Sequence, residues 1–493
     1  MEEEAKSRKA IALFIAFGTK GDVYPLAAIA AAFARNQQHY SVVLMSHSAH
    51  ENLSSHLIKA KVSFFPITSP PALSSDSLGT QNATDSLRTI FLEEKERIKR
   101  EHRQECLSAF RSIFGKGPCM EGDFVVINFF ALEGWSLAEL FQIRCVVAAP
   151  YVVPYSPPTG FERQFRKELP DLYKYLKEAP IGKVSWSDVT HWMWPLFTEE
   201  WGSWRYEELN LSCYPFAVGS SNRPSNLALP AAISLGLVSC EFSWWYGFSK
   251  EIVEWPGRLE TDDSHKCSNH TELYTFISSF EPALPIFVGL SSIGSMGFVR
   301  DPLAFLRVLQ SVIQITGYRF IIFTAGYGPL DAAIWTIANG SDTSEKQSLH
   351  AGISIFDGKL FCFSGMVPYN WLFRRCAAAI HHGGSGSVAA ALQAGLPQII
   401  CPFMLDQFYW AEKMYWLGVA PQPLKRNHLL LEKTNDENIK EAAQVVAEAI
   451  YDALSAKTRA RAMEIAELLS LEDGVTEAVR VLREEVCEVS GSN

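Results

Sequence analysis

The chain has 493 residues, of which 48% are hydrophobic and 20% are charged. This length predicts two large domains, and this composition excludes a wholly disordered chain because it supplies enough apolar side chains for a full core. Lys and Arg number 44 against 54 Asp and Glu, which gives a formal net charge of −10. That charge argues against nucleic acid as the main partner.

The amino-terminal segment does not have the pattern of a secretory signal. The chain begins Met-Glu-Glu-Glu, which is too acidic, and its first apolar run, residues 10–17, is short. No run of about 20 apolar residues is present for a membrane span. No two of the ten cysteines have the C-x-x-C spacing of a zinc or redox site. We therefore expect a cytoplasmic protein with reduced thiols.

The first half of the chain predicts a parallel α/β sheet. The apolar run 10–17 has strand length and is followed by a glycine-containing turn and an Ala-rich helix that ends near residue 35. Further strands are predicted at 41–45, 62–66, 124–129 and 145–150, with a helix at 135–142. This alternation is typical of a doubly wound sheet.

The same pattern begins again after about residue 250. Strands are predicted at 284–290, 319–324, 360–363, 377–381 and 398–401, and helices at 303–316 and 388–394. We predict a first domain at 1–253, a linker at 254–272, a second domain at 273–435 and a helical tail at 436–493.

The most informative segment is His-His-Gly-Gly-Ser-Gly-Ser at residues 381–387, between a predicted strand and a predicted helix. Its glycines let the backbone approach a ligand, Ser387 is suited to cap the helix, and a helix amino terminus favours an anion. The segment matches neither the P-loop nor the Gly-x-Gly-x-x-Gly pattern. It indicates a diphosphate site, with a tight structural turn as the alternative.

Polar residues on either side of this segment support a ligand site. Asp406 and Gln407 follow a predicted strand, where a carboxylate and an amide are placed to bind sugar hydroxyls. Val367 lies in an extended stretch whose backbone is able to pair with a nucleobase. A helix cap for Asp406 and a core position for Trp371 are the structural alternatives.

Taken in order, these motifs resemble a known family. Val-Pro-x-x-Trp-Leu-Phe (367–373), His-His-Gly-Gly-x-Gly-Ser (381–387), Gly-x-Pro (395–397) and Pro-Phe-x-x-Asp-Gln (402–407) resemble the donor motif of sterol 3-β-glucosyltransferases. Gly-Thr-Lys-Gly-Asp-Val-Tyr-Pro at 18–25 is similar to their Gly-Ser-Arg-Gly-Asp-Val-Gln-Pro. The resemblance implies the α/β GT-B fold: two Rossmann-like, doubly wound parallel-sheet domains facing a cleft, with a C-terminal helix that returns to the first domain.

The resemblance also implies which residues bind the UDP-sugar. His382 would contact the diphosphate, Val367 the uracil, and Asp406 the sugar. The implied donor-binding residues are Thr19, Lys20, Gly21, Ser291, Ser292, Val367, His382, Gly384, Gly386, Ser387, Asp406 and Gln407. The family's Gly-Phe-Gly-Ser reads Gly-Leu-Ser-Ser at 289–292, so either serine is a candidate for the phosphate contact.

Asp22 is the candidate general base. Many plant glycosyltransferases have a His in this Gly-x-x-x-Pro context, paired with an Asp near the end of a later strand. Here Asp22 replaces the His, and the later strand ends at the neutral Asn128. The alternative role for Asp22 is to cap a helix that begins at Val23, and both roles are compatible.

The implied reaction is inverting transfer of glucose from UDP-glucose to a hydroxyl of a sterol, steroidal or triterpenoid acceptor. Trp135, Trp192, Trp194 and Trp201 are candidate acceptor-binding residues, and the Trp-rich segment 160–206 would either line an apolar pocket or make a peripheral membrane contact. Open alternatives are a phenolic or other lipophilic acceptor, an epimerase, and a non-catalytic UDP-sugar- or sterol-binding protein. We expect no metal, cofactor, nucleic-acid or protein partner.

Overall fold

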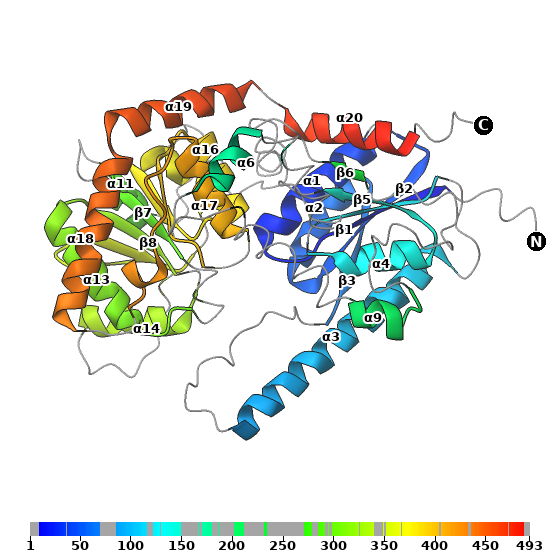
Figure 1. Ribbon diagram of the computed structural model, residues 1–493, viewed down its shortest axis with the longest axis horizontal. Helices are drawn as coiled ribbons and strands as arrows, with labels where there is room; N and C mark the ends of the chain where they lie inside the picture. The colour runs from blue at the N-terminus through cyan, green and yellow to red at the C-terminus, as the bar shows by residue number, and fades with distance from the viewer. Residues whose placement is uncertain are drawn as a thin grey trace, which may run out of the picture. The chain divides into compact units, whose positions relative to one another are not determined.

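The structure is a computed structural model, and it describes most of the chain (Figure 1). The described residues are 9–35, 37–69, 85–115, 122–128, 130–148, 166, 170–179, 186, 202–211, 231–233, 271–278, 284–290, 294, 298–324, 326–339, 349, 352–365, 367–403, 406–431, 435–471 and 473–487. The chain forms two compact units, one of residues 1–72, 83–253 and 472–493, the other of residues 73–82 and 254–471. The predicted linker, 254–272, lies almost wholly outside the described residues.

The first unit contains a six-stranded parallel sheet in the order β3-β2-β1-β4-β5-β6. Its strands are β1 (Ala10–Ile15), β2 (Tyr40–His47), β3 (Val62–Ile67), β4 (Phe124–Ile127), β5 (Arg144–Ala148) and β6 (Ala231–Ile233). The central strand β1 is almost continuously apolar and buried, as expected for a parallel strand covered on both faces. Since the strands are parallel, their carboxyl ends share one edge of the sheet.

The first unit also contains helices. They are α1 (Lys20–Arg35), η1 (Ser48–Leu53), α2 (Ser54–Lys59), α3 (Asp85–Phe114), α4 (Leu132–Leu140), α6 (Pro170–Lys177), α9 (Gly202–Glu207) and α20 (Gly474–Cys487). The last helix, α20, packs on α1 and β6, with the Arg483 guanidinium 5.8 Å from the Phe33 ring centroid. The predicted return of a C-terminal helix to the first unit is therefore confirmed (Figure 1).

The second unit contains a sheet in the order β12-β11-β7-β8-β10-β9, parallel except for β9. Its strands are β7 (Ile286–Gly289), β8 (Phe320–Phe323), β9 (Ile353–Ile355), β10 (Leu360–Phe363), β11 (Ala378–His381) and β12 (Gln398–Ile400). Its helices are α11 (Thr271–Ser278), α13 (Pro302–Thr316), α14 (Gly328–Asn339), α15 (Tyr369–Leu372), η3 (Phe373–Arg375), α16 (Ser385–Gln393), α17 (Gln407–Trp416), η4 (Arg426–His428), α18 (Asp436–Ala453) and α19 (Ala456–Ser470).

Local sequence explains where the helices of the second unit begin and end. Asp301 caps α13 by accepting the N–H of Ala304 at 2.9 Å, and Pro302 occupies the first helical position. Gly317 ends this helix in the left-handed conformation, with φ +71°. Apolar faces of α13, α14 and α18 then pack on the second sheet. The two-sheet α/β architecture predicted from the sequence is confirmed.

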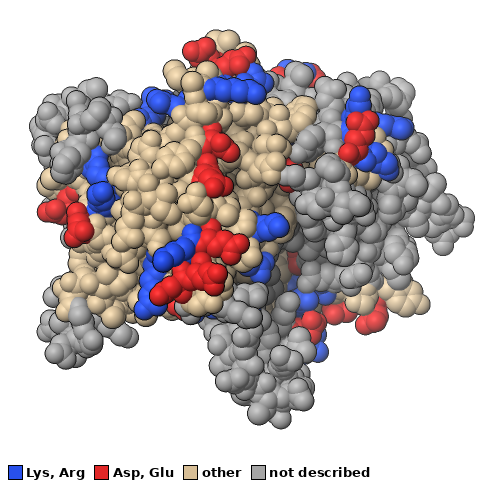
Figure 2. Space-filling view, turned by 60° about the vertical axis from the view of Figure 1, so that its left-hand side comes forward, with Lys and Arg blue, Asp and Glu red and all other residues tan. Residues whose placement is uncertain are grey.

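Two further predictions concern the cysteines and the membrane. Described cysteines with free thiols are Cys106, Cys145, Cys362, Cys376 and Cys401, and all five are buried. Within the described part of the chain, no helix combines the length and the apolar character needed to cross a bilayer. On the face seen in Figure 2, basic and acidic side chains lie beside one another over the described surface.

Candidate active site

The turn between β1 and α1 holds the predicted base, Asp22. Thr19 occupies the N-cap of α1, because its carbonyl oxygen accepts the backbone N–H of Val23 at 3.0 Å. Asp22 Oδ2 accepts both the backbone N–H of Thr19, at 2.8 Å, and its hydroxyl, at 2.7 Å. The helix therefore begins at Lys20, before the predicted Val23, because Asp22 caps it from within the first turn.

Gly18 makes room for this carboxylate. Its φ of +109° lies in the region that glycine tolerates, and a Cβ added there would lie 2.7 Å from Asp22 Oδ2. Both hydrogen bonds from Thr19 to the carboxylate involve Oδ2, and no described residue donates to Oδ1. The turn thus fixes one oxygen of Asp22 and leaves the other available to a ligand.

Burial changes the acidity of Asp22. Desolvation of the half-buried carboxyl raises its pKa from 3.8 to about 6, while the two hydrogen bonds from Thr19 oppose that rise. A carboxylate with a pKa near 6 is a better proton acceptor than an exposed one and is still ionised at neutral pH. Asp22 therefore has the protonation behaviour that a general base needs.

Asn128, directly after β4, holds the turn that carries Asp22. Its Oδ1 accepts the N–H of Phe17 at 3.2 Å. Its Nδ2 donates to the carbonyl oxygens of Phe17, at 2.7 Å, and of Asp22, at 3.1 Å. Because a carboxylate has no proton to donate, an Asp at this position would lose the two bonds from Nδ2. The hydrogen bonds of the Asn128 side chain are thus all to the main chain of the turn.

The other residues of this turn were predicted to bind the UDP-sugar. Thr19 and Lys20 are exposed and Gly21 is half-buried. The Thr19 hydroxyl donates to Asp22, and partial burial lowers the pKa of Lys20. These three residues surround the base, and their contact with a donor stays a prediction.

In the second unit, His381 shapes the predicted diphosphate loop, residues 381–387. Its Nε2 lies 3.0 Å from Gln398 Oε1, and its Nδ1 accepts the N–H of Gly383 at 3.0 Å. Gly383 has φ +86°, and a Cβ there would lie 2.8 Å from Ile400 Cγ2. Burial lowers the pKa of His381 to about 3, so it is neutral and structural.

His382 faces the amino terminus of α16. A Cβ added to Gly384 would lie 2.6 Å from His382 Nε2, so the ring and this glycine are in close contact. Burial lowers the pKa of His382 to about 4, although a hydrogen bond with the backbone of Gly289 opposes this shift. Because the bond with Gly289 raises this pKa, the ring donates its one N–H to a carbonyl oxygen, and the backbone N–H groups at the amino terminus of α16 are the donors placed to meet an anion.

The start of α16 differs from the prediction. The helix begins at Ser385, with Gly384 in the N-cap position, and not at Val388. Gly386 and Ser387 therefore lie in the first turn, where Ser387 does not cap the helix as predicted. Burial raises the pKa of Tyr369 to about 12, although a hydrogen bond with the Ser387 side chain opposes this shift. Backbone N–H groups of this turn and the Ser387 hydroxyl are the groups that would face a phosphate.

Asp406 and Gln407 lie at the amino terminus of α17, close to the diphosphate loop. Asp406 occupies the N-cap position but makes no side-chain cap bond, and its Oδ2 accepts the indole N–H of Trp410 at 2.9 Å. Gln407 Oε1 accepts the N–H of Phe403 at 2.9 Å. Gln407 Cα would lie 3.7 Å from a Cβ on Gly383, which brings α17 against the loop.

The remaining predicted residues fall into two groups. Val367 is buried and lies two residues before α15, and the Arg375 guanidinium lies 4.5 Å from the ring centroid of Trp371 in that helix. Trp135 is buried in α4. Ser291, Ser292, Trp192, Trp194 and Trp201 lie outside the described residues. Within the described ranges, no three His, Cys, Asp or Glu side chains form a group able to hold a metal ion.

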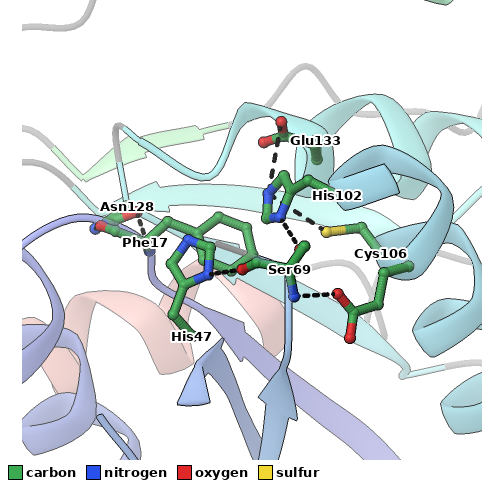
Figure 3. Close-up of polar contacts among 8 residues, drawn as sticks. Phe17, His47, Ser69, His102, Cys106, Asn128 and Glu133 are labelled. Carbon is green, nitrogen blue, oxygen red and sulfur yellow. Dashed lines mark hydrogen bonds and ion pairs between the residues drawn. The ribbon is translucent and has the colours of Figure 1, made fainter. Parts of the chain in front are cut away.

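A polar cluster lies at the carboxyl edge of the first sheet (Figure 3). The sequence did not predict it. His47 ends β2, Ser69 follows β3, and His102 and Glu133 come from α3 and α4. Ser69 Oγ lies 2.9 Å from His102 Nδ1, and the two imidazole rings are stacked with centroids 5.2 Å apart. Polar residues at strand ends were the available signal, but α3 and α4 contribute through tertiary packing alone.

Two solved structures share this fold. The glycosyltransferase of kitacinnamycin, a solved structure, matches 97% of this chain and 99% of its own with a TM-score of 0.54 at 13% identity. The calicheamicin glycosyltransferase CalG4 matches 98% and 100% with a TM-score of 0.52 at 14% identity. The chain therefore has the GT-B fold of these glycosyltransferases.

The relatives that match in sequence belong to a narrower group of enzymes. A sterol 3-beta-glucosyltransferase of Arabidopsis thaliana is 25% identical over 464 residues, 94% of this chain and 63% of that protein. One from Komagataella phaffii is 23% identical over 480 residues, 96% of this chain and 34% of that protein. Residues 360–467 match the family model of the erythromycin biosynthesis protein CIII-like C-terminal domain. The predicted similarity to sterol 3-β-glucosyltransferases is confirmed, and the chain spans less than two thirds of these relatives' length.

Proposed function

We propose that this protein transfers glucose from UDP-glucose to a hydroxyl of a sterol, steroidal or triterpenoid acceptor. The observation that carries the proposal is the Asp22 turn, a fixed carboxylate whose pKa burial raises to about 6. The similarity to sterol 3-β-glucosyltransferases over 94% of the chain supports the sterol-type acceptor. In this proposal the first unit binds the acceptor and the second binds the donor.

The proposed chemistry is a single displacement. Asp22 Oδ1 takes the proton of the acceptor hydroxyl as that oxygen forms a bond to the anomeric carbon, and the bond from this carbon to the diphosphate breaks. UDP leaves with the bonding electron pair, and the anomeric centre is inverted, so an α-linked donor gives a β-glycoside. Thr19 keeps the carboxylate oriented through Oδ2 during this step.

The charge on the departing UDP is met by residues of the diphosphate loop. The first-turn N–H groups of α16 and the hydroxyl of Ser387 donate to the phosphates, and the His382 ring lies beside them. Val367 would pair with uracil through its backbone, and Asp406 and Gln407 would hold sugar hydroxyls. We propose that these groups suffice and that the step needs no metal.

The experiment is acceptor-dependent UDP release from UDP-glucose with a panel of sterols, steroidal and triterpenoid aglycones and flavonoids. We expect release with a sterol-type acceptor, loss of turnover in Asp22→Asn with UDP affinity retained, and loss of UDP affinity in His382→Ala. If only flavonoids drove UDP release, the proposed sterol-type acceptor would be wrong and a phenolic acceptor would replace it. UDP binding with no acceptor-driven release would reduce the protein to a nucleotide-sugar binder.

A further inference from the structure

The polar cluster of the first unit lies where a ligand of this sheet would bind. His47 ends β2, and Phe17, Ser69 and Asn128 follow β1, β3 and β4 of the same sheet. The four residues therefore share the carboxyl edge, the usual binding edge of an open α/β sheet. Figure 3 shows the Phe17 ring beside the two imidazoles. Its ring centroid lies 4.7 Å from that of His47 and 4.8 Å from that of His102. The cluster thus places polar side chains around one aromatic ring.

Hydrogen bonds fix which nitrogen of each histidine carries the proton. His47 Nδ1 lies 3.2 Å from the carbonyl oxygen of Ser69, and a carbonyl only accepts, so Nδ1 is protonated. His102 Nε2 lies 3.8 Å from Glu133 Oε1, which favours the proton on Nε2 and leaves His102 Nδ1 to accept from the Ser69 hydroxyl. Both histidines stay neutral because burial lowers the pKa of each to about 4.

The Ser69 segment is itself held in place. Glu105 accepts the N–H of Thr68 at 2.7 Å and the N–H of Ser69 at 2.8 Å, which ties the end of β3 to α3. With these bonds made, His47 Nε2 has no hydrogen-bond partner among the described residues. His47 is only 5% exposed. Its ring therefore presents one hydrogen-bond acceptor in a fixed direction.

We propose that His47 Nε2 binds a second hydroxyl of the acceptor, so that the preferred substrate is a lipophilic diol glycosylated at its other hydroxyl. This inference rests on the proposed function. The lone pair on Nε2 requires a donor group, and a hydroxyl supplies one without the desolvation cost of a buried ammonium. Asp22, the stronger base, takes the reacting hydroxyl.

The test compares two matched variants. In His47→Asn the side-chain amide still reaches Ser69 in place of Nδ1 but nothing replaces Nε2, whereas in His47→Gln the amide replaces Nε2. The probes are rigid steroidal diols that share the reactive hydroxyl and differ in the position of the second, each paired with its mono-ol. The readout is the ratio of kcat/KM for diol to mono-ol, in which general damage to the enzyme cancels.

We expect the wild type to prefer at least one diol by about 10-fold or more, His47→Asn to bring that ratio to about 1, and His47→Gln to keep part of the preference. A wild-type ratio near 1 for every pair, or a preference that survives in His47→Asn, would overturn the inference while leaving the transferase intact. If no acceptor drives UDP release, the proposed function fails, and the inference fails with it.

Discussion

Replacement of Asn128 is the most direct test of how the chain positions its base. The side chain is 1% exposed and makes three hydrogen bonds, of 3.2, 2.7 and 3.1 Å, to the main chain of Phe17 and Asp22. Asn128→Ala leaves three backbone groups without these bonds, and at about 1 kcal/mol each we expect a loss of about 2–4 kcal/mol in the free energy of unfolding. A displaced Asp22 should lower kcat by about 100-fold.

Asn128→Asp separates positioning from simple destabilisation. The carboxylate has the same shape but donates no hydrogen bond to the two carbonyl oxygens, and its negative charge disfavours ionisation of Asp22. Because the Asp22 pKa is about 6, we expect an acid limb near pH 6 in the kcat/KM profile of the wild type, and we expect this limb to move to higher pH in Asn128→Asp. A purely structural role would lower activity at every pH without moving that limb.

The assay combines UDP release, UDP affinity and urea unfolding. Asn52, an exposed asparagine whose Nδ2 bonds to Tyr24 of α1 at 3.2 Å, provides the control substitution Asn52→Ala. UDP affinity should change by less than about threefold in both Asn128 variants, because the diphosphate loop belongs to the other unit. A folded Asn128→Ala that retains more than about a third of wild-type kcat would refute the reasoning.

Three further predictions follow from the geometry and the pKa values. Because burial raises the pKa of Asp22 from 3.8 to about 6, its ionised form costs the folded state free energy, so Asp22→Asn should raise the urea midpoint at pH 7.5, with the gain vanishing near pH 4. Burial lowers the pKa of His47 and His102 from 6.5 to about 4, so the unfolded state binds more protons below pH 6.5. Each of these histidines should therefore lower the free energy of unfolding by about 2 kcal/mol at pH 5 relative to neutral pH. Urea unfolding of the wild type and of His47→Asn at both pH values would measure the share of His47. Gly384→Ala, whose Cβ would lie 2.6 Å from His382 Nε2, should weaken UDP binding in calorimetry, whereas Gly328→Ala, with nothing within 4 Å, should not.

Periodicity in the sequence predicted much of the fold. The buried runs of β1 and β10 are apolar throughout, and every strand predicted from such a run lies within two residues of an observed strand. The strands β6 and β9, of three residues each, were not predicted, whereas β12, of the same length, was. A strand this short has too few residues for its pattern alone to identify it.

Helix starts were harder to predict, because the deciding bonds are not visible in the order of residues. The sequence placed the start of α1 at Val23, yet the bond from Thr19 to Asp22 begins the helix at Lys20. The roles of the two adjacent histidines also needed the structure. His381 is held by Gln398, which is distant in the chain, and only His382 faces Gly384.

The two interpretations of Asp22, helix cap and general base, are compatible because a carboxylate has two oxygens. Oδ2 accepts the two bonds from Thr19 and so fixes the orientation of the group, which leaves Oδ1 for a proton. Asn128 fixes the same turn from β4, so the position of Oδ1 is set from both sides. A base gains more from such a fixed position than from intrinsic basicity, since misplacement of about 1 Å costs about 100-fold in rate. The cap that the sequence offered as an alternative to catalysis is therefore what makes the proposed catalysis possible.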